Sequence, residues 1–380
     1  MLRSSSWPDD RERTLKYSQT ETPLLDRVNS PVELKQLERD QLPQLADEMR
    51  QVILDTVQVT GGHLGSGMGV VELTIALHYI FNFADDRLVW DVGHQCYPHK
   101  LLTERKDRIH TLRQKDGLSG FSNRFESKYD AYLMGHAGTA TSAGLGISVG
   151  DRLKGRDRHT VSVVGDAALG CGVAFEALNH AGTLEKDRLL VILNDNKWSI
   201  AETVGALSRH LNRVRTGPFY NHVKKRLHQL LQSIPVIGKD VDTKLEHGLE
   251  LLRTIVTPGH IFEALGFEYF GPIDGHDTEE LLTTLERVKD RPGVVFLHVK
   301  TQKGKGVPGS EDRYDRAHAA KPGSKPAAKP APTTKVAVPV EPKVVVPQKK
   351  QKRGRAWTEW FSDAMLELAE KNRDVVALTS

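Results

Sequence analysis

The sequence predicts an α/β protein built on a doubly wound, mostly parallel sheet with helices on both faces. Short runs rich in Val, Ile and Leu alternate along the chain with stretches of helical periodicity. The runs are almost continuously apolar, which is typical of parallel strands that are buried on both faces. Polar turns that contain glycine follow several of the runs, as expected where the carboxyl ends of such strands bind ligands.

The expected elements follow one another along most of the chain. The predicted strands are residues 88–92, 160–164, 189–193 and 294–299. The predicted helices are residues 70–81, 140–153, 172–184 and 279–288. Residues 205–258 are polar and helical in pattern without a strand, so we expect a helical excursion from the sheet.

The C-terminal part has a different composition. Residues 319–355 hold seven of the eighteen prolines and ten Lys or Arg residues against one acid, Glu341. Proline blocks helices and sheet ladders and the lysines repel one another, which predicts a linker. A nucleic-acid-binding tail is the alternative, although the segment lacks the aromatic residues that stack on bases.

Beyond this segment, residues 357–372 place apolar side chains at helical spacing and residues 375–379 read as a short strand. We interpret them as the first helix and strand of a second domain. The expected organisation is a tail at 1–28, a main domain at 29–318, a linker at 319–355 and the start of a second domain at 356–380.

The net charge has to be divided before it is interpreted. The whole chain carries +4 and the predicted linker +9, so the remainder carries −5. The basic character therefore belongs to one segment and indicates no nucleic-acid-binding face on the main domain. We expect no nucleic-acid partner.

Cysteine usage and hydropathy bear on the compartment. The two cysteines, Cys96 and Cys171, cannot form a disulfide framework and indicate a reducing environment. No apolar run approaches the ~18 residues that a membrane span needs, and the polar N-terminus lacks a signal-peptide core. We therefore expect a cytoplasmic enzyme without a membrane partner.

Polar residues follow two of the predicted strands. Gly165-Asp166-Ala167-Ala168 comes directly after one strand, and Asn194-Asp195-Asn196 ends the next. Asp and Asn oxygens at neighbouring strand ends can converge on Mg²⁺ that also binds a diphosphate. Alternatively, Asp166 caps the following helix and Asn194 to Asn196 form a turn. Their joint position at strand ends favours the metal.

This pair resembles the thiamine diphosphate motif of transketolase-like enzymes, a Gly-Asp-Gly followed further along by an Asn. Several other segments resemble the 1-deoxy-D-xylulose-5-phosphate synthase family and occur in the same order. They are Gly62-His63-Leu64-Gly65-Ser66-Gly67, the stretch 90–100 (WDVGHQCYPHK), Gly135-His136, the stretch 174–182 (AFEALNHAG) and the stretch 271–277 (GPIDGHD). The resemblance covers roughly residues 29–318.

The resemblance implies a transferase that condenses pyruvate with glyceraldehyde 3-phosphate and releases CO2. It implies thiamine diphosphate and Mg²⁺ as cofactors, a homodimer, and a role in isoprenoid, thiamine and pyridoxal precursor synthesis. In such chemistry the cofactor's carbanion attacks the pyruvate carbonyl and its thiazolium then acts as the electron sink for decarboxylation.

The resemblance also implies roles for single residues. Asp166 and Asn196 are the expected Mg²⁺ ligands, together with the backbone carbonyl of Trp198. His63 and His318 are expected near the reacting carbon, where imidazole can transfer protons near neutral pH. The expected cofactor-binding residues are His94, Gly135, His136, Ala137, Ala167, Ala168, Asn196, Lys303 and Val307. We expect His99, His180 and His276 to make structural hydrogen bonds.

Several matched positions depart from the family. Ala167 replaces a glycine, Ala137 and Gly138 replace two serines, Trp198 replaces a methionine, and Val307 replaces a tyrosine. These changes favour a diverged paralogue with weakened cofactor affinity as an alternative.

The family carries its cofactor-activating glutamate on a second domain, past residue 380. We therefore expect the chain to need a C-terminal part, as a fragment of a longer enzyme or as one half of a split enzyme. Another transketolase-like activity and a non-catalytic cofactor-binding protein are the remaining hypotheses.

Overall fold

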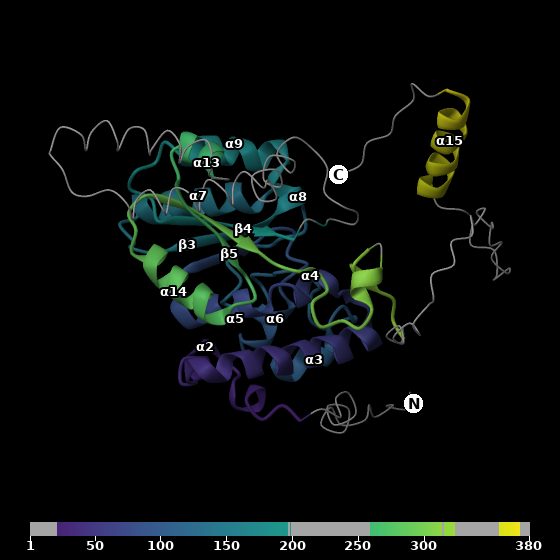
Figure 1. Cartoon of the computed structure of the whole chain (residues 1–380), viewed down its shortest axis with the longest axis horizontal. Helices are drawn as coiled ribbons and strands as arrows, with labels where there is room; N and C mark the ends of the chain where they lie inside the picture. Colours follow the sequence, from purple (N-terminus) through teal and green to yellow (C-terminus); the bar gives the residue numbers. More distant parts are fainter. Residues whose placement is uncertain (1–20, 197, 199–258, 314, 324–356, 373–380) are drawn as a thin grey trace, which may run out of the picture. The chain divides into compact units, whose positions relative to one another are not determined.

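The computed structural model describes residues 21–196, 198, 259–313, 315–323 and 357–372. The chain divides into two units, Met1–Pro330 and Ala331–Ser380. The first unit contains a five-stranded sheet with the order β2-β3-β4-β6-β5 (Figure 1). The predicted excursion at 205–258, most of the predicted linker and the predicted strand at 375–379 lie outside the described residues.

All neighbouring strands of this sheet are parallel. The strands are β2 (Arg87–Trp90), β3 (Thr160–Gly165), β4 (Leu189–Asp195), β5 (Glu268–Asp274) and β6 (Val294–Lys300). Four of the five were predicted from their apolar runs. Gly165 at the end of β3 lies beside Asn194 of β4, and Asp195 lies beside Lys300 of β6. The carboxyl ends of the central strands therefore meet at one edge.

Alternate residues of each strand face two separate apolar cores. Val163 and Ile192 belong to the core formed with α3 (Leu42–Thr60), α5 (Val71–Ile80) and α14 (Thr278–Lys289). Val191 and Phe296 belong to the core on the other face, formed with α7 (Ala140–Leu153), α9 (Gly172–Ala181) and α13 (His260–Ala264). Figure 1 shows these two groups of helices on opposite sides of the strands. The predicted doubly wound fold is confirmed.

Short elements complete the first unit. They are η1 (Leu25–Arg27), α2 (Pro31–Leu34), η2 (Arg39–Gln41), α4 (Gly65–Met68), α6 (Tyr97–Leu101), η3 (Lys106–Thr111), α8 (Asp166–Leu169) and η4 (Ser310–Asp312). A second, two-stranded sheet pairs β1 (Gly62–His63) with β7 (Ala319–Ala320) in antiparallel fashion.

Residues beyond both ends of the predicted main domain, 29–318, also pack against it. The backbone N–H groups of Leu24 and Leu25 donate to Glu48 Oε2 at 3.0 and 2.8 Å. At the other end, the N–H of Gly323 donates to the carbonyl of Gln58 at 2.7 Å. The ladder of β7 therefore uses the first residues of the range that we expected to be a linker.

The described part of the second unit is α15 (Trp357–Lys371), at the position of the predicted helix. Trp360, Phe361, Leu366 and Leu368 are each more than half exposed. No helix in the described ranges is both long and apolar enough to cross a membrane.

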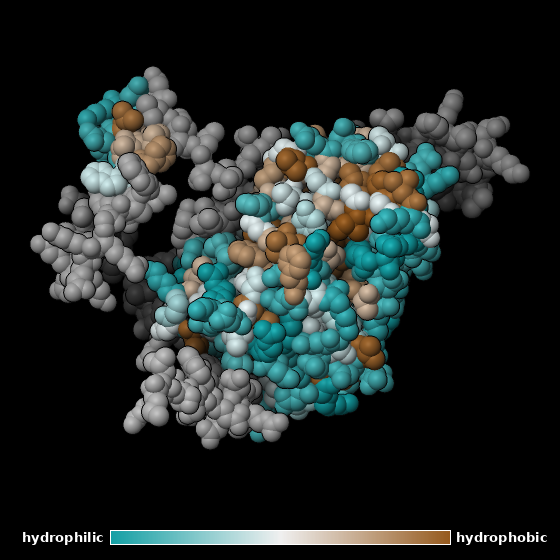
Figure 2. Space-filling model, turned by 180° about the vertical axis from the view of Figure 1, so that it is seen from behind, coloured by the Kyte–Doolittle hydropathy of each residue, from teal (hydrophilic) through white to brown (hydrophobic). Residues whose placement is uncertain are grey.

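The surface of the first unit is uneven in polarity. Figure 2 shows hydrophobic residues gathered over the upper part of one face, while the lower part is mainly hydrophilic. On α9, near the top of the first unit in Figure 1, Val173 and Phe175 are 49% and 45% exposed. Leu133 is 52% exposed.

Candidate active site

The predicted site residues lie just beyond the carboxyl ends of the strands. His94 follows β2, Asp166 follows β3, Asn196 follows β4 and Lys303 follows β6. Parallel strands direct these connecting segments to the same edge of the sheet, where backbone and side chains can meet a ligand.

Three histidine rings form a cluster at this edge. The ring centroid of His63 lies 5.2 Å from that of His94 and 5.3 Å from that of His318. The centroids of His94 and His318 are 6.1 Å apart. The β1–β7 ladder brings His63 and His318 together, because His63 pairs with Ala319 and the N–H of Leu64 donates to the carbonyl of His318.

The cluster lies in an environment that disfavours positive charge on the imidazoles. Burial, reinforced by the neighbouring His63 and His318, lowers the pKa of His94 to about 3. Burial and the adjacent Lys303 lower the pKa of His318 to about 4. The pKa of His63 is also lowered, by burial and then by Arg113 and Lys303. All three rings are therefore neutral at neutral pH.

Two of these rings have a buried nitrogen without a partner. His63 Nδ1 and His94 Nδ1 are inaccessible to solvent and make no hydrogen bond to any of the described residues. A buried polar atom without a partner is costly, and in native proteins it is often explained by function or by a missing ligand. The histidine cluster is therefore incomplete as it stands.

Lys303 is the fourth member of what we call the histidine cluster, which consists of His63, His94, His318 and Lys303. It is only 4% exposed, and its Nζ lies 2.9 Å from His318 Nδ1. Burial lowers the pKa of Lys303 to about 8, although Asp315 and Asp166 act in the opposite direction. The ammonium group donates to His318 Nδ1, so His318 carries its proton on Nε2.

A buried carboxylate holds the loop that carries Lys303. Glu72 is paired with Arg50 and lies 3.2 Å from His276 Nδ1, and the N–H of Gln302 donates to His276 Nε2 at 2.8 Å. Burial raises the pKa of Glu72, but His276 and Arg50 outweigh it and hold that pKa at about 2. The expected structural role of His276 is thus confirmed.

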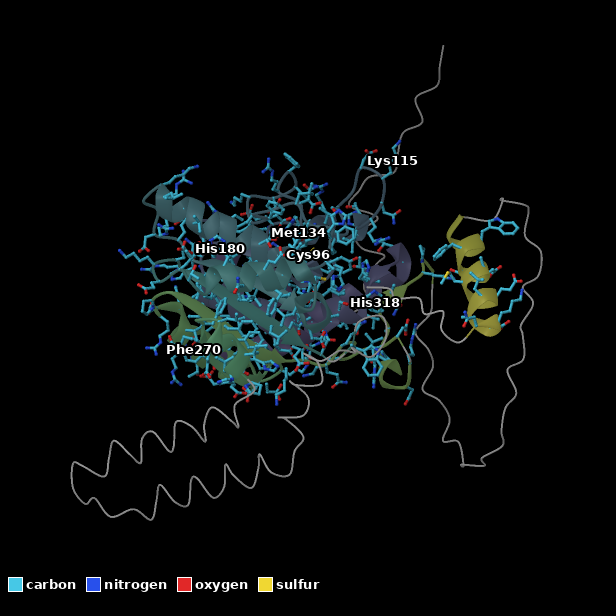
Figure 3. All side chains as sticks on the ribbon, turned by 90° about the horizontal axis from the view of Figure 1, so that it is seen from above. Cys96, Lys115, Met134, His180, Phe270 and His318 are labelled. Carbon is cyan, nitrogen blue, oxygen red and sulfur yellow. The ribbon has the colours of Figure 1, made fainter. Side chains whose placement is uncertain are left out.

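The other two histidines with an expected structural role differ from each other. His99 is buried and bonded to Asp130 and His78. His180 is exposed on α9, with no ring hydrogen bond to a described residue, and lies well away from His318 in Figure 3. The expectation is confirmed for His99 and wrong for His180.

The predicted metal ligands lie on adjoining strand ends. Asp166 Oδ1 accepts from the N–H of Ala167 at 2.9 Å, and Asn196 Oδ1 accepts from the N–H of Trp198 at 3.0 Å. Neither contact is the helix cap or turn of the alternative, because Gly165 is the N-cap of α8 without a side-chain cap bond and Asn194 and Asp195 belong to β4. Carboxylate and amide oxygens have capacity for more than one partner. The Trp198 ring packs under the Arg316 guanidinium, 4.6 Å from the centroid.

Among the described residues, no group of three or more His, Cys, Asp or Glu side chains is arranged to hold a metal ion. The set predicted from the sequence contains one carboxylate, one amide oxygen and one backbone carbonyl, which is a different kind of site. Mg²⁺ commonly binds through one or two carboxylates and takes its other ligands from water and phosphate.

Asp91 was not predicted as a functional residue, yet it fixes the loop that carries several predicted ones. Its carboxylate accepts from the N–H groups of Gly138 and Ala140, both at 3.0 Å. Burial raises the pKa of Asp91 against the effect of these N–H groups. Its position near the carboxyl end of the predicted strand at 88–92 was the available signal.

The remaining predicted residues fall into two groups. The segment of Gly135, His136 and Ala137 is exposed, as is Ala167, whereas Ala168 is buried. A Cβ at Gly135 or Gly165 would meet no atom within 4 Å, so open space adjoins the backbone there. Val307 packs against the core that contains α3 and α5.

Comparison with known proteins identifies the class first. A solved transketolase from Campylobacter jejuni shares the fold with a TM-score of 0.55 and 20% identity, covering 76% of this chain and 41% of that one. The family model described as 1-deoxy-D-xylulose-5-phosphate synthase matches residues 25–301. The chain belongs to the 1-deoxy-D-xylulose-5-phosphate synthase family.

Two relatives named 1-deoxy-D-xylulose-5-phosphate synthase indicate the extent of the match. The protein from Caldanaerobacter subterraneus subsp. tengcongensis is 44% identical over 357 residues, which are 94% of this chain and 54% of that protein. The protein from Glaesserella parasuis serovar 5 is 51% identical over 292 residues, which are 76% of this chain and 47% of that protein. The chain spans about half the length of these relatives.

Proposed function

We propose that the chain supplies the cofactor-diphosphate side of a synthase that condenses pyruvate with glyceraldehyde 3-phosphate and releases CO2. The histidine cluster at the carboxyl ends of the strands carries this proposal, because it combines neutral imidazoles, a buried ammonium and unpartnered nitrogens. The product would be 1-deoxy-D-xylulose 5-phosphate. The whole reaction is proposed for the complete enzyme, since this chain spans about half of its relatives.

The residues present fit thiamine diphosphate and Mg²⁺. The buried Nδ1 atoms of His63 and His94 lack partners among the described residues, and Gly135 and Gly165 border open space. We assign Asp166, Asn196 and the Trp198 carbonyl to Mg²⁺. The cofactor would contact His94, Gly135, His136, Ala137, Ala167, Ala168, Asn196, Lys303 and Val307. When bound, it supplies a nucleophilic carbon and an electron sink.

The chain's own residues would move protons and hold charge. His318, whose pKa is lowered to about 4, is neutral near neutral pH and can donate the proton on Nε2 while Nδ1 takes one from Lys303. His63 lies beside it with a lowered pKa and can serve in the same way. Lys303 places a positive charge next to these rings, which favours an anionic substrate group such as a carboxylate. The centroid of the Phe121 ring lies 5.9 Å from that of His63, so an apolar side chain borders the cluster.

Binding tests the metal assignment directly. Asp166→Ala is expected to abolish Mg²⁺-dependent binding of thiamine diphosphate, because the diphosphate would then lack its cation. Titration calorimetry on the chain measures this, with Asp157→Ala as the control because Asp157 is an exposed aspartate paired with Arg188. Unchanged affinity in the Asp166 variant would refute the assignment.

Turnover tests the proposed reaction and the expectation that it needs a C-terminal part as well as this chain. We expect synthase activity from the chain only when a separately made C-terminal part of a full-length relative is added. Product formation from pyruvate and glyceraldehyde 3-phosphate measures it. Decarboxylation of pyruvate with a different aldehyde as the better acceptor would favour another transketolase-like activity. Cofactor binding without turnover in either mixture would favour the non-catalytic paralogue.

We also propose a homodimer, in keeping with the exposed apolar side chains of Val173, Phe175 and Leu133. Exposed apolar patches commonly mark interaction surfaces. Light scattering coupled to size exclusion tests the proposal, and a Phe175→Lys variant that remains as associated as the wild type would count against this surface. The free thiols of Cys96 and Cys171 are in keeping with a cytoplasmic location.

A further inference from the structure

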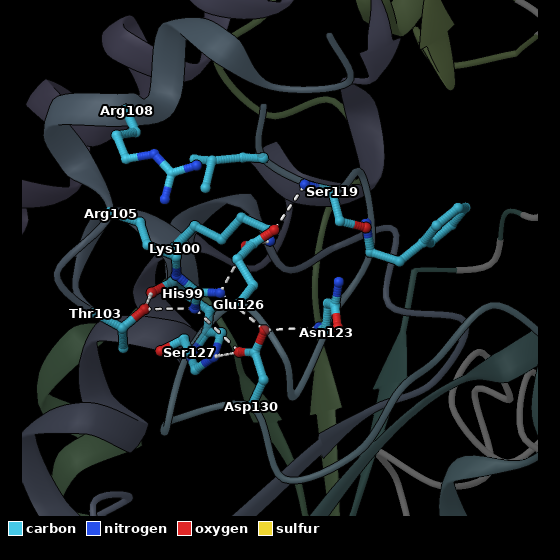
Figure 4. Close-up of polar contacts among 12 residues, drawn as sticks. His99, Lys100, Thr103, Arg105, Arg108, Ser119, Asn123, Glu126, Ser127 and Asp130 are labelled. Carbon is cyan, nitrogen blue, oxygen red and sulfur yellow. Dashed lines mark hydrogen bonds and ion pairs between the residues drawn. The ribbon is translucent and has the colours of Figure 1, made fainter. Parts of the chain in front are cut away.

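Behind the histidine cluster lies a second set of buried ionisable side chains, which we call the α6–loop cluster. It consists of His99, Lys100, Arg105, Glu126 and Asp130 (Figure 4). Their side chains are between 0% and 8% exposed. Helix α6 and the residues that follow it supply the first three, and the loop before Gly135 supplies the two acids.

Asp130 is the centre of this cluster. It accepts from His99 Nε2 at 2.7 Å and from two nitrogens of Arg105 at 2.8 and 3.0 Å. It also accepts from the backbone N–H of Asn123 at 2.8 Å. Burial raises the pKa of Asp130, but these hydrogen bonds outweigh it and hold that pKa well below its ordinary value.

Glu126 makes a second connection between the same two segments. It is paired with Lys100, accepts from Arg105 at 2.9 Å and accepts from the N–H of Ser119 at 2.7 Å. Lys100 and Arg105 supply two positive charges, and Glu126 and Asp130 supply two negative ones. The formal charges of the buried set therefore cancel.

The histidines give the cluster a fixed hydrogen-bond direction. Burial lowers the pKa of His99 even though Asp130 raises it, and burial lowers the pKa of His78 well below its ordinary value. Neutral His99 donates from Nε2 to Asp130, so its Nδ1 accepts from His78 Nε2 at 2.8 Å. The chain of donors runs from α5 through α6 into the loop.

Each of the two connected segments adjoins a residue of the candidate active site: His94 precedes α6, and Gly135 follows the loop. His94 lies a few residues before α6, and Gly93 packs against Ser122 and Met134 so closely that an added Cβ would lie 3.0 and 3.1 Å from them. The N–H of Met134 donates to the carbonyl of Ser122 at 3.2 Å, directly before Gly135. The loop that the acids hold thus continues into the predicted cofactor segment.

Stability alone does not account for so many buried charges. Removing two ions from water costs several kcal/mol each, and well-packed apolar residues usually stabilise a core equally well. A set of directional bonds does, however, fix the relative position of two segments more narrowly than apolar packing does.

We propose that Asp130 and Glu126 are positioning residues: through Arg105, Lys100 and His99 they hold the 113–137 loop against α6 and so fix His94 relative to Gly135, His136 and Ala137. The part of this inference that concerns the cofactor rests on the proposed function. The part that concerns the loop does not.

Asp130→Asn tests the proposal, with Asp187→Asn as the matched control. Asp187 is also a buried aspartate, 2% exposed, and it accepts from Arg152 Nε at 3.0 Å just before the amino end of β4. Hydrogen–deuterium exchange on the chain without cofactor measures the loop. Titration calorimetry with thiamine diphosphate and Mg²⁺ measures binding.

The proposal expects Asp130→Asn to speed exchange selectively in 113–137 and to weaken cofactor binding about tenfold or more, as when groups that orient ligands are lost. Asp187→Asn should do neither, even at an equal loss in melting temperature. Exchange that rises evenly along the chain in both variants, or an unchanged loop, would overturn it. If Asp130→Asn does not fold, Glu126→Gln provides the same comparison. If the wild type does not bind the cofactor, the proposed function fails while the exchange result still decides the positioning role.

Discussion

The two polar clusters, the histidine cluster and the α6–loop cluster, differ in how their buried groups find partners. In the α6–loop cluster, every charge is paired and the formal charges cancel. In the histidine cluster, the one charged group is Lys303, and two buried imidazole nitrogens have no partner among the described residues. The first cluster balances its charges within the chain, although Arg105 Nε has no partner among the described residues. The second leaves a positive charge and two imidazole nitrogens that a ligand could engage.

The contrast is clearest for two histidines in the same short segment. His99 and His94 are both removed from water, and burial lowers the pKa of each. His99 has Asp130 and His78 as partners, while His94 Nδ1 has none in the described chain. Burial therefore does not separate these two histidines, whereas the partners of their ring nitrogens do. An unpartnered nitrogen alone does not mark a functional histidine, because His78 Nδ1 is also buried without a partner among the described residues.

The largest expected effect comes from breaking the α6–loop cluster. Arg105→Met leaves Asp130 with an uncompensated buried charge, so we expect the free energy of unfolding to fall by about 3 to 5 kcal/mol. Denaturant unfolding followed by circular dichroism measures it. Arg105→Met combined with Asp130→Leu restores the charge balance and should recover at least half of the loss. A double variant as unstable as the single one would show that packing, not charge, dominates.

A smaller effect of opposite sign on the free energy of unfolding is expected in the histidine cluster. His94→Leu removes a buried nitrogen that lacks a partner, so the free energy of unfolding should stay constant or rise by about 1 kcal/mol. Affinity for thiamine diphosphate should fall in the same variant, since His94 is assigned to the cofactor. Unfolding and calorimetry together test the trade-off. A destabilisation comparable to that of Arg105→Met would remove the distinction between the clusters.

The pH dependence of stability should separate the clusters. The folded-state pKa of His318 is about 4, below its unfolded value near 6.5, so stability is fully present above 6.5 and declines as pH falls towards 4. After allowance for solvent screening of this half-buried ring, the decline is on the order of 1 kcal/mol. His318→Gln should make this decline shallower without removing it, because His94 and His63 also have lowered pKa values.

Asp130 contributes in a different range. Its pKa is lowered in the folded state, so its contribution is present above its unfolded value near 3.9 and is lost only as pH falls below that value. Unfolding curves at a series of pH values test both windows. If stability declines over one pH range only, and the His318→Gln variant shows the same decline as the wild type, the role of His318 in the upper pH range is contradicted.

The smallest effect concerns the predicted linker. Deleting residues 324–355 should change the melting temperature by no more than about 1 °C, because their composition offers little apolar area to bury. Extending the deletion to residue 319 removes β7 and should disturb the histidine cluster while sparing the α6–loop cluster. Scanning calorimetry measures both. A marked drop for the shorter deletion would show that the segment packs.

The sequence predicted the elements whose burial leaves a regular pattern. Four strands carry continuous apolar runs because helices cover both faces of the sheet. The strand β5 escaped prediction because it is an edge strand interrupted by Gly271-Pro272, with a shifted register between Phe270 and Ile273. Helix α3 was also missed, as its buried face includes charged residues such as Glu48 and Arg50.

The candidate site also has features that the sequence could predict and features that it could not. The neighbouring positions of Asp166 and Asn196 could be predicted because adjacent parallel strands end at one edge. The meeting of His63 with His318 depends on a ladder only two residues long on each side, which has no periodicity to detect. The burial of Lys303 and the role of Asp91 depend on tertiary contacts, which local patterns do not encode.

The contact between Gly138 and Cys171 limits which substitutions this loop tolerates. Gly138 has a φ of +79°, and any Cβ there would clash with the Cys171 side chain. A serine, as the resembling family has at this position, is therefore incompatible with the present cysteine and backbone. A side chain at residue 138 would require a smaller neighbour at residue 171 and a different turn, so we expect substitutions at the two positions to be coupled.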